Sequence, residues 1–245
     1  MKLQQLYSHV RCAIQDYEMI AEDDRIAVGV SGGKDSLTLL SALAGLRRFY
    51  PIHFDIVAVT VDLGLKGMDW SSIASFCEEL QVDYHIVKTQ ISEIIFDERK
   101  ESSPCSLCAK MRKGALNQEA LNLGCNKVAY AHHMDDMVET ALLSLFYEGR
   151  FYCFPPVTYL DQTGLTVIRP LMYVKECEVI GFMHKNPLPV IKNECPADGF
   201  TKREYVKQLV RKLYQENHDV KKHIYHAIET AHFPDWPEKK SGLKA

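Results

Sequence analysis

Four short apolar runs alternate with helical segments along the first 147 residues, and this alternation constrains the fold more than any other feature. The apolar runs lie at 25–30, 53–61, 82–89 and 126–131. Segments with apolar residues at helical spacing separate and follow these runs, at 37–48, 70–80, 110–123 and 134–147. Strands that alternate with helices pair in parallel through crossover connections. We therefore predict an α/β fold with a doubly wound parallel sheet of about five strands.

The rest of the chain predicts a helix before this core and a looser region after it. The N-terminal helix is expected within 1–22, where the apolar periodicity covers 3–21. Glycines and prolines follow residue 148 and predict loops. After that point we expect a strand, a helix, a short strand and a helical C-terminal part, at 165–170, 174–185, 189–192 and 200–232. No linker-like stretch interrupts the chain, so we predict one domain over 1–245.

Composition indicates an ordinary globular protein. Hydrophobic residues make up 47% and charged residues 25% of the chain, which argues against disorder and coiled coils. No apolar run reaches about 18 residues, so we expect no membrane span. The first twenty residues contain Arg11 and Asp16 and no continuous apolar segment, unlike a secretory signal. We therefore expect a cytoplasmic protein with reduced cysteines.

A glycine loop follows the first predicted strand directly. The run SGGKDS at 31–36 separates that strand from a helix, which is the context of an anion site, because loop N–H groups and the helix N-terminus face the ligand. The spacing differs from that of a Walker A loop and of the dinucleotide-binding fingerprint. The alternative is a glycine turn in which Ser and Asp cap the helix.

Two further groups of polar residues follow predicted strands. Asp62 and Gly64 follow the second strand, where ligands bind in open α/β sheets or where an Asp-x-Gly turn ends a strand. The run AHHMDD at 131–136 follows the fourth strand. This run resembles the G-H-x-x-D-D motif of tRNA-modifying pyrophosphatases, and the resemblance implies that Asp135 lies near the reacting atoms as a Mg²⁺ ligand or proton acceptor. Asp136 and His133 are interpreted either as part of this site or as helix caps.

Three cysteines stand out among the eight in the chain. Cys105 and Cys108 form a C-x-x-C after Pro104, which we place in a loop before a helix, and Cys195 lies in a late loop. Three thiolates would hold three irons of a cubane cluster and leave the fourth iron open. A zinc site or an accidental pair is the alternative, and a lone Cys is often a small buried hydrophobe.

A local basic stretch occurs in a chain whose net charge is −3. Residues 201–223 contain seven Lys and Arg against three Asp and Glu. Arg203, Lys207 and Arg211 recur every four residues and share one helical face. Such a stripe suits an RNA backbone, and it equally suits the solvated face of an amphipathic helix.

The loop at 31–36 resembles the pyrophosphate loop of the ATP pyrophosphatase (PP-loop) superfamily, whose members adenylate a substrate and release pyrophosphate. Together with the C-x-x-C, the H-x-x-D-D run, the segment 168–174 and the late Cys, it resembles the tRNA 2-thiocytidine synthetase family over about 20–215. Two departures are Ala131, where the motif has Gly, and Cys-Pro-Ala-Asp at 195–198, where family members have a second C-x-x-C.

The resemblance implies three sets of site residues. It implies that ATP with Mg²⁺ is bound by Val30, Ser31, Gly32, Gly33, Lys34, Asp35, Ser36, Asp62 and His132. It implies a [4Fe-4S] cluster on Cys105, Cys108 and Cys195, and catalytic roles for Asp135, Arg112 and Lys34.

The predicted activity is the ATP-dependent and iron–sulfur-dependent thiolation of a pyrimidine C2 position in tRNA through an adenylated intermediate. The partners expected are tRNA and a sulfur donor, either sulfide or the persulfide of a cysteine desulfurase. A homodimer is one of the assemblies that the chain could form. Two alternatives stay open. One is a cluster-free PP-loop enzyme that amidates tRNA or resembles lysidine synthetase, and the other is a nucleotide-binding metal sensor.

Overall fold

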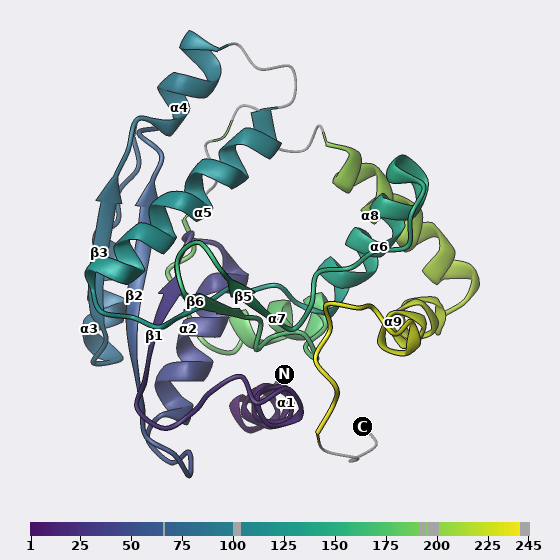
Figure 1. The fold of residues 1–245 in the computed structure, drawn as a ribbon, viewed down its shortest axis with the longest axis horizontal. Helices are drawn as coiled ribbons and strands as arrows, with labels where there is room; N and C mark the ends of the chain where they lie inside the picture. Colours follow the sequence, from purple (N-terminus) through teal and green to yellow (C-terminus); the bar gives the residue numbers. More distant parts are fainter. Residues whose placement is uncertain (66, 100–103, 192–194, 196–200, 241–245) are drawn as a thin grey trace.

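A mostly parallel sheet lies at the centre of the computed structural model, which describes residues 1–65, 67–99, 104–191, 195 and 201–240. Its strand order is β3-β2-β1-β4-β6-β5 (Figure 1). All neighbouring strands pair in parallel except β5, which is antiparallel to β6. The strands are β1 (Asp24–Gly29), β2 (Phe54–Asp62), β3 (Asp83–Lys88), β4 (Lys127–Ala129), β5 (Val157–Leu160) and β6 (Leu165–Ile168).

The helices of the described residues alternate with the first four strands and then dominate the last third of the chain. They are α1 (Leu3–Asp16), α2 (Lys34–Leu46), α3 (Ser71–Glu79), α4 (Ile91–Glu93), the π-helical turn η1 (Ile94–Glu98), α5 (Pro104–Asn122), α6 (Met134–Glu148), α7 (Glu176–Met183), α8 (Lys202–Glu216) and α9 (Val220–Thr230). Within these residues no helix combines the length and the apolar character that a membrane span requires.

Helices cover both faces of the sheet, so the fold is doubly wound. On one face, Ile26 and Val28 of β1 pack into a large buried cluster with side chains of α1, α2 and α3. On the other face, Leu116 and Ala120 of α5 pack over Ala27 and its neighbours in β2 and β4. Figure 1 shows α5 and α2 on opposite sides of the strands. Successive residues of a strand point to opposite faces of the sheet. Because helices cover both faces, the middle residues of β1 and β2 are apolar on both sides.

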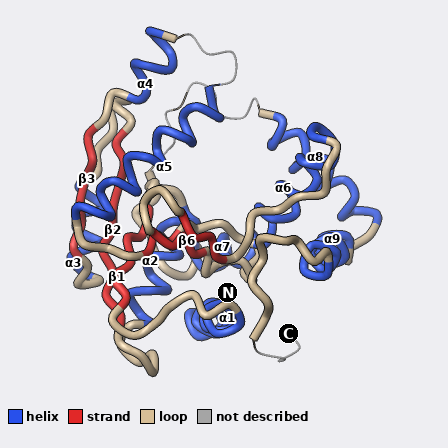
Figure 2. Tube along the Cα trace, in the orientation of Figure 1, coloured by secondary structure: helices blue, strands red, loops and turns tan. Residues whose placement is uncertain are grey.

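The last two helices are joined to the core through α6 and lie to one side of the sheet (Figure 2). Val206 and Val210 of α8 and Ile228 of α9 are almost fully buried and belong to the same cluster as the residues of α1 and α2. Residues from both ends of the chain therefore share one buried core.

The α/β prediction is confirmed, and the sheet differs from it in one strand. It has six strands because β5, which was predicted as a loop, pairs with β6 at the edge of the sheet. The short strand predicted at 189–192 is not found within 189–191, where the amide of Ile191 donates one hydrogen bond to the carbonyl of Gly32 at 2.9 Å. Residue 192 lies outside the described part.

Two helix boundaries also differ from the predictions. α1 ends at Asp16 rather than near residue 21, and Glu18 just beyond it adopts a φ of +46°, which a helix does not tolerate. α5 begins at Pro104, six residues before the predicted start. Proline suits the first position of a helix because the amide it lacks has no intrahelical partner there. Cys105 and Cys108 therefore lie in the first turns of α5 and not in a loop.

Candidate active site

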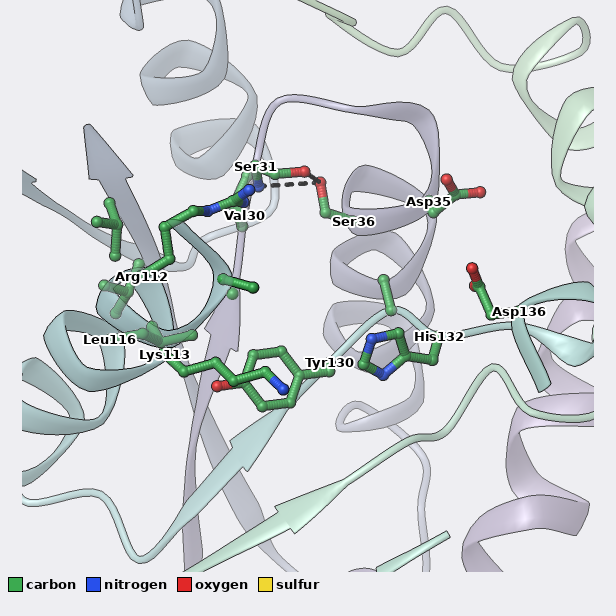
Figure 3. Close-up of a pocket in the computed structure, with 15 residues that line it drawn as sticks. Val30, Ser31, Asp35, Ser36, Arg112, Lys113, Leu116, Tyr130, His132 and Asp136 are labelled. Atoms are coloured by element: carbon green, nitrogen blue, oxygen red, sulfur yellow. Dashed lines mark hydrogen bonds between the residues drawn. The ribbon is translucent and has the colours of Figure 1, made fainter. Parts of the chain in front are cut away.

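The loop after β1 is closed by a serine of the helix that follows it. The Oγ of Ser36 accepts a hydrogen bond from the amide of Ser31 at 3.1 Å (Figure 3). The same Oγ donates a hydrogen bond to the carbonyl of Gly33 at 2.9 Å. The closed loop leads directly into α2 at Lys34. The first amides of a helix have no intrahelical acceptors and carry positive partial charge. This end of α2 therefore suits an anion such as a phosphate.

Gly32 is required at its position by both conformation and space. Its φ is +81°, in the left-handed region that glycine adopts most readily. A Cβ there would lie 3.3 Å from side-chain atoms of both Ile191 and Trp70. Gly32 is thus packed against two residues that also line the second cavity described below.

Two charged side chains start α2. The Nζ of Lys34 lies 3.0 Å from Oδ2 of Asp35 and 3.4 Å from Oε1 of Glu176. Burial alone would lower the pKa of Lys34, but the two carboxylates outweigh it and raise the pKa, so Lys34 is a full positive charge. The Oδ1 of Asp35 is buried, and no described residue donates a hydrogen bond to it. A carboxylate oxygen in this situation suits a hard cation such as Mg²⁺.

A cavity of about 340 Å³ opens beside the loop, between α5 and the ends of β1, β2 and β4. Its floor is apolar and its walls carry charged and polar groups. It is lined by Gly29, Val30, Ser31, Asp35, Ser36, Val59, Val61, Ala109, Arg112, Lys113, Leu116, Tyr130, Ala131, His132 and Asp136. Figure 3 shows Arg112 on one side of this first cavity and the carboxylates of Asp35 and Asp136 on the other. Six residues predicted for the site, from three separate segments, meet here.

A second cavity of about 230 Å³ adjoins the first, and both are lined by Ser31, Val61 and Arg112. Asp62 lines only the second cavity, together with Gly33 and hydrophobic residues of the segment after β2. The Oδ1 of Asp62 also accepts a hydrogen bond from the amide of Gly64 at 3.0 Å. Asp62 thus makes the Asp-x-Gly turn and borders a cavity as well.

The far end of the first cavity carries polar groups without partners. The Nδ1 of His132 and the Oη of Tyr130 are buried, and neither has a hydrogen-bond partner among the described residues. Burial lowers the pKa of His132 well below its ordinary value, and the nearby Arg169 lowers it further, so the imidazole is neutral. Its ring lies 4.7 Å from that of Phe154, centroid to centroid. These groups are available to the hydrogen-bonding edge of a bound ring.

Sequence reasoning identified His132 but missed Tyr130 and Lys113 as lining residues. The position of Tyr130, one residue after β4, was a usable signal, because side chains at the carboxyl edge of a parallel sheet face ligands. Lys113 follows Arg112 on α5, and burial lowers its pKa.

The two aspartates of the 131–136 run have different surroundings. Asp136 lines the first cavity and forms a capping box with His133: its Oδ2 accepts from the amide of His133 at 3.0 Å. Asp135 does not line that cavity. Its Oδ2 accepts from the amide of Glu176 at 2.7 Å, and its Oδ1 lies 2.5 Å from Nζ of Lys221. The carboxylate that faces the cavity is therefore the second of the pair.

The basic stripe predicted as a possible RNA surface is partly engaged by acids. The side chain of Arg203 is 45% exposed and lies 3.1 Å from Oε2 of Glu139, and Lys207 lies 2.6 Å from Oε1 of Glu176. Arg211 is exposed. Two of the three side chains thus pair with acids of α6 and α7, while Val206 and Val210 form the buried face of α8. An RNA surface at this stripe stays a prediction.

The three predicted cysteines come together beside Arg112. Burial raises the pKa of Cys108, the Cys195 and Cys105 thiols raise it further, and the Arg112 guanidinium opposes the rise. Cys105 on α5 and Cys195 in the late loop thus both lie close enough to Cys108 to act on its charge. Among the described residues, no three His, Cys, Asp or Glu side chains are arranged around a single metal ion.

Comparison with known proteins identifies the family. The PP-loop domain family model matches residues 2–214. The tRNA-cytidine(32) 2-sulfurtransferase of Geobacter sulfurreducens is 43% identical over 219 residues, which is 88% of this chain and 85% of that protein. The chain belongs to the tRNA-cytidine(32) 2-sulfurtransferase family of PP-loop proteins. Its relative from Citrifermentans bemidjiense is 41% identical over 223 residues, 90% of this chain and 88% of that one.

The fold of this tRNA-cytidine(32) 2-sulfurtransferase family member also matches a solved structure. The U34-tRNA thiolase NcsA from Methanococcus maripaludis, determined with its [4Fe-4S] cluster, superposes with a TM-score of 0.75. The match covers 92% of this chain and 78% of NcsA at 23% identity, and it shows a shared fold. The resemblance predicted from the sequence motifs is thus confirmed at the level of family and fold.

Proposed function

We propose that this protein is an ATP-dependent sulfurtransferase that converts a cytidine of tRNA to 2-thiocytidine. The observation that carries the proposal is the position of Arg112, which lines both cavities next to the phosphate loop and acts on the charge of Cys108 together with Cys105 and Cys195. The activity printed for relatives about 42% identical supports the choice of tRNA cytidine as substrate.

ATP is proposed to occupy the first cavity, with its phosphates on the loop 31–36. The apolar floor at Val59 and Val61 suits a purine face, and the neutral His132 suits its polar edge. The free amides of α2 and the ammonium of Lys34 would neutralise the phosphate charge. Mg²⁺ would bind Asp35, whose Oδ1 lacks a hydrogen-bond partner among the described residues.

The reaction proposed has two displacements. The C2 oxygen of the cytosine attacks the α-phosphorus of ATP, and pyrophosphate leaves. Sulfide then attacks C2, and AMP leaves with the former C2 oxygen. If the donor is the persulfide of a cysteine desulfurase, a thiol must first reduce its outer sulfur to sulfide. Arg112, between the two cavities, would neutralise charge at the α-phosphate in both displacements.

Cys105, Cys108 and Cys195 are proposed to hold a [4Fe-4S] cluster. Three neighbouring thiols are the donor set of a cluster with one iron open, and such an iron binds a sulfur ligand when the cluster is present. A set of three cysteines fits this group better than a zinc ion, which usually takes four protein ligands in a structural site.

The two acids are proposed to have separate tasks. Asp136 faces the first cavity and would accept a proton or bind Mg²⁺ there. Asp135 is proposed as a positioning residue, since its carboxylate is engaged by the amide of Glu176 and by Lys221. Asp62 would border the entrance through the second cavity.

The deciding experiment is an anaerobic assay of the full-length protein, reconstituted with iron and sulfide, with unmodified tRNA, Mg²⁺-ATP and sulfide. Nucleosides from the digested tRNA are analysed by mass spectrometry, and pyrophosphate is measured in parallel. We expect 2-thiocytidine and an equal amount of pyrophosphate, and neither without ATP. Incorporation of an amine in place of sulfur would establish the cluster-free ligase instead, and ATP binding without pyrophosphate release would establish a sensor.

A further inference from the structure

One carboxylate oxygen joins the phosphate loop to the C-terminal helices. The Oε1 of Glu176 lies 3.4 Å from Nζ of Lys34 and 2.6 Å from Nζ of Lys207. Lys34 starts α2 beside the loop, Lys207 belongs to α8, and Glu176 starts α7. Three charged side chains from distant segments therefore form one network at the edge of the site, with Glu176 between the two lysines.

The position of Glu176 is fixed by the backbone around it. Its amide donates to Oδ2 of Asp135 at 2.7 Å, and the amide of Met134 donates to the carbonyl of Val174 at 2.9 Å. The side chain of Glu176 is 15% exposed. Its carboxylate is thus presented to Lys34 by α6 and α7 together and is not a freely moving surface group.

The charge of Glu176 is maintained by the two lysines. Burial alone would raise its pKa, but the hydrogen bond and charge of Lys207, with the charge of Lys34, lower it to about 2. Glu176 is therefore an anion throughout the physiological range. An anion beside Lys34 has two opposite effects: it holds the ammonium in place, and it competes with phosphate for that ammonium.

We propose that Glu176 is a positioning residue that holds Lys34 for the phosphates of ATP, and that Lys207 regulates how tightly it does so. This inference rests on the proposed function, because it requires ATP phosphates at the loop. The ammonium of Lys207 partly neutralises the carboxylate of Glu176. The attraction between Glu176 and Lys34 is thereby weakened, and Lys34 can bind phosphate. The Lys207 side chain thus acts on the nucleotide site through Glu176.

The test is the affinity of the full-length protein for α,β-methylene-ATP with Mg²⁺, measured by calorimetry. E176Q removes the competing anion, so we expect about threefold to tenfold tighter binding together with a lower kcat. K207Q leaves Glu176 to Lys34 alone, so we expect about threefold to tenfold weaker binding. In the double variant the loss caused by K207Q should disappear, since its effect passes through Glu176.

The matched control is K212Q, which removes an exposed lysine of the same helix α8 and should leave the affinity within a factor of two. A residue with a merely structural role would weaken binding in both single variants, and that result overturns the inference. Equal effects of K207Q and K212Q also overturn it. If E176Q does not fold, as judged by circular dichroism, the comparison of K207Q with K212Q decides alone.

Failure of the proposed function gives a different pattern. If the wild-type protein does not bind the analogue, or if K34A binds it as well as the wild type does, the loop is not the phosphate site. If the wild type binds and K34A loses affinity while E176Q and K207Q change it in the same direction, only the inference about Glu176 fails.

Discussion

Arg203 on α8 donates a hydrogen bond at 3.1 Å to the carboxylate of Glu139 on α6, whose side chain is 7% exposed. The same guanidinium reaches the hydroxyl of Thr140 at 3.2 Å. Burial and the neighbouring Asp136 raise the pKa of Glu139, and Arg203 opposes that rise. Arg203 therefore compensates a buried charge where α8 meets the core.

Removal of Arg203 should destabilise the protein. R203A leaves the buried carboxylate of Glu139 without its ion-pair partner, so we expect the free energy of unfolding to fall by about 1–3 kcal/mol. Urea denaturation measures the change. R211A is the matched control on the same helix, because Arg211 is exposed, and it should change stability by less than about 0.5 kcal/mol. Similar losses of stability in both variants would show that the ion pair of Arg203 with Glu139 does not stabilise the fold.

Glu176 should contribute a pH-dependent part of the stability. Its pKa in the folded protein is about 2, below the ordinary value of 4.5. A carboxyl whose pKa is lowered by folding stabilises the folded state above the unfolded pKa, and the contribution is lost as pH falls toward the folded pKa. The stability difference between the wild type and E176Q should therefore be constant above about pH 5.5 and shrink from about pH 4.5 downward. Urea titrations from pH 7 to pH 3.5 check this, and a difference that grows on acidification would refute it.

Two glycines should respond to alanine in opposite ways. G32A places a Cβ at a φ of +81° and against Ile191 and Trp70, so it should cost about 1–2 kcal/mol of stability and weaken ATP binding. G114A adds a Cβ in α5 with no atom within 4 Å, so it should stabilise the helix by about 0.5–1 kcal/mol. Thermal denaturation measures both. A stabilised G32A would show that the loop does not require glycine.

The three cysteines should be needed for thiolation and not for nucleotide binding. C108S and C195S should abolish formation of thiolated nucleoside and leave the affinity for α,β-methylene-ATP unchanged, because neither residue lines the two cavities beside the loop. C177S is the control, since Cys177 is exposed on α7. Persistent thiolation in C195S would remove the late loop from the site. Exposure to air should inactivate the wild type, because a cluster with an open iron is sensitive to oxidation.

Local sequence patterns were sufficient for the centre of the fold. The runs that became β1, β2 and β4 are mainly buried and apolar, because helices cover both sides of the sheet there, and the SGGKDS run marked the start of α2. β5 could not be recognised, since its four residues form a partly exposed edge strand among prolines and glycines. The start of α5 was missed although Pro104 at the first helical position was a usable signal.

The sequence indicated which residues lie at the edge of the sheet, but it gave much less information about the direction of their side chains. Strand ends placed His132 and the two aspartates at the right edge of the sheet. Which aspartate faces the cavity depends on the partners of Asp135, which come from α7 and α9. The ion pairs of Arg203 and Lys207 likewise depend on acids of α6 and α7, and helical periodicity holds no information about such distant partners.

The single helix α5 carries the thiols at its first turns, Arg112 two turns after Cys105, and Leu116 on the floor of the first cavity. Because an α-helix rises about 1.5 Å per residue, α5 fixes the distance along its axis between the two thiols and the first cavity. Lengthening it by one residue between Cys108 and Arg112 would swing both thiols by about 100° around the axis. The number of residues between Cys108 and Arg112 therefore fixes the direction of both thiols relative to the first cavity.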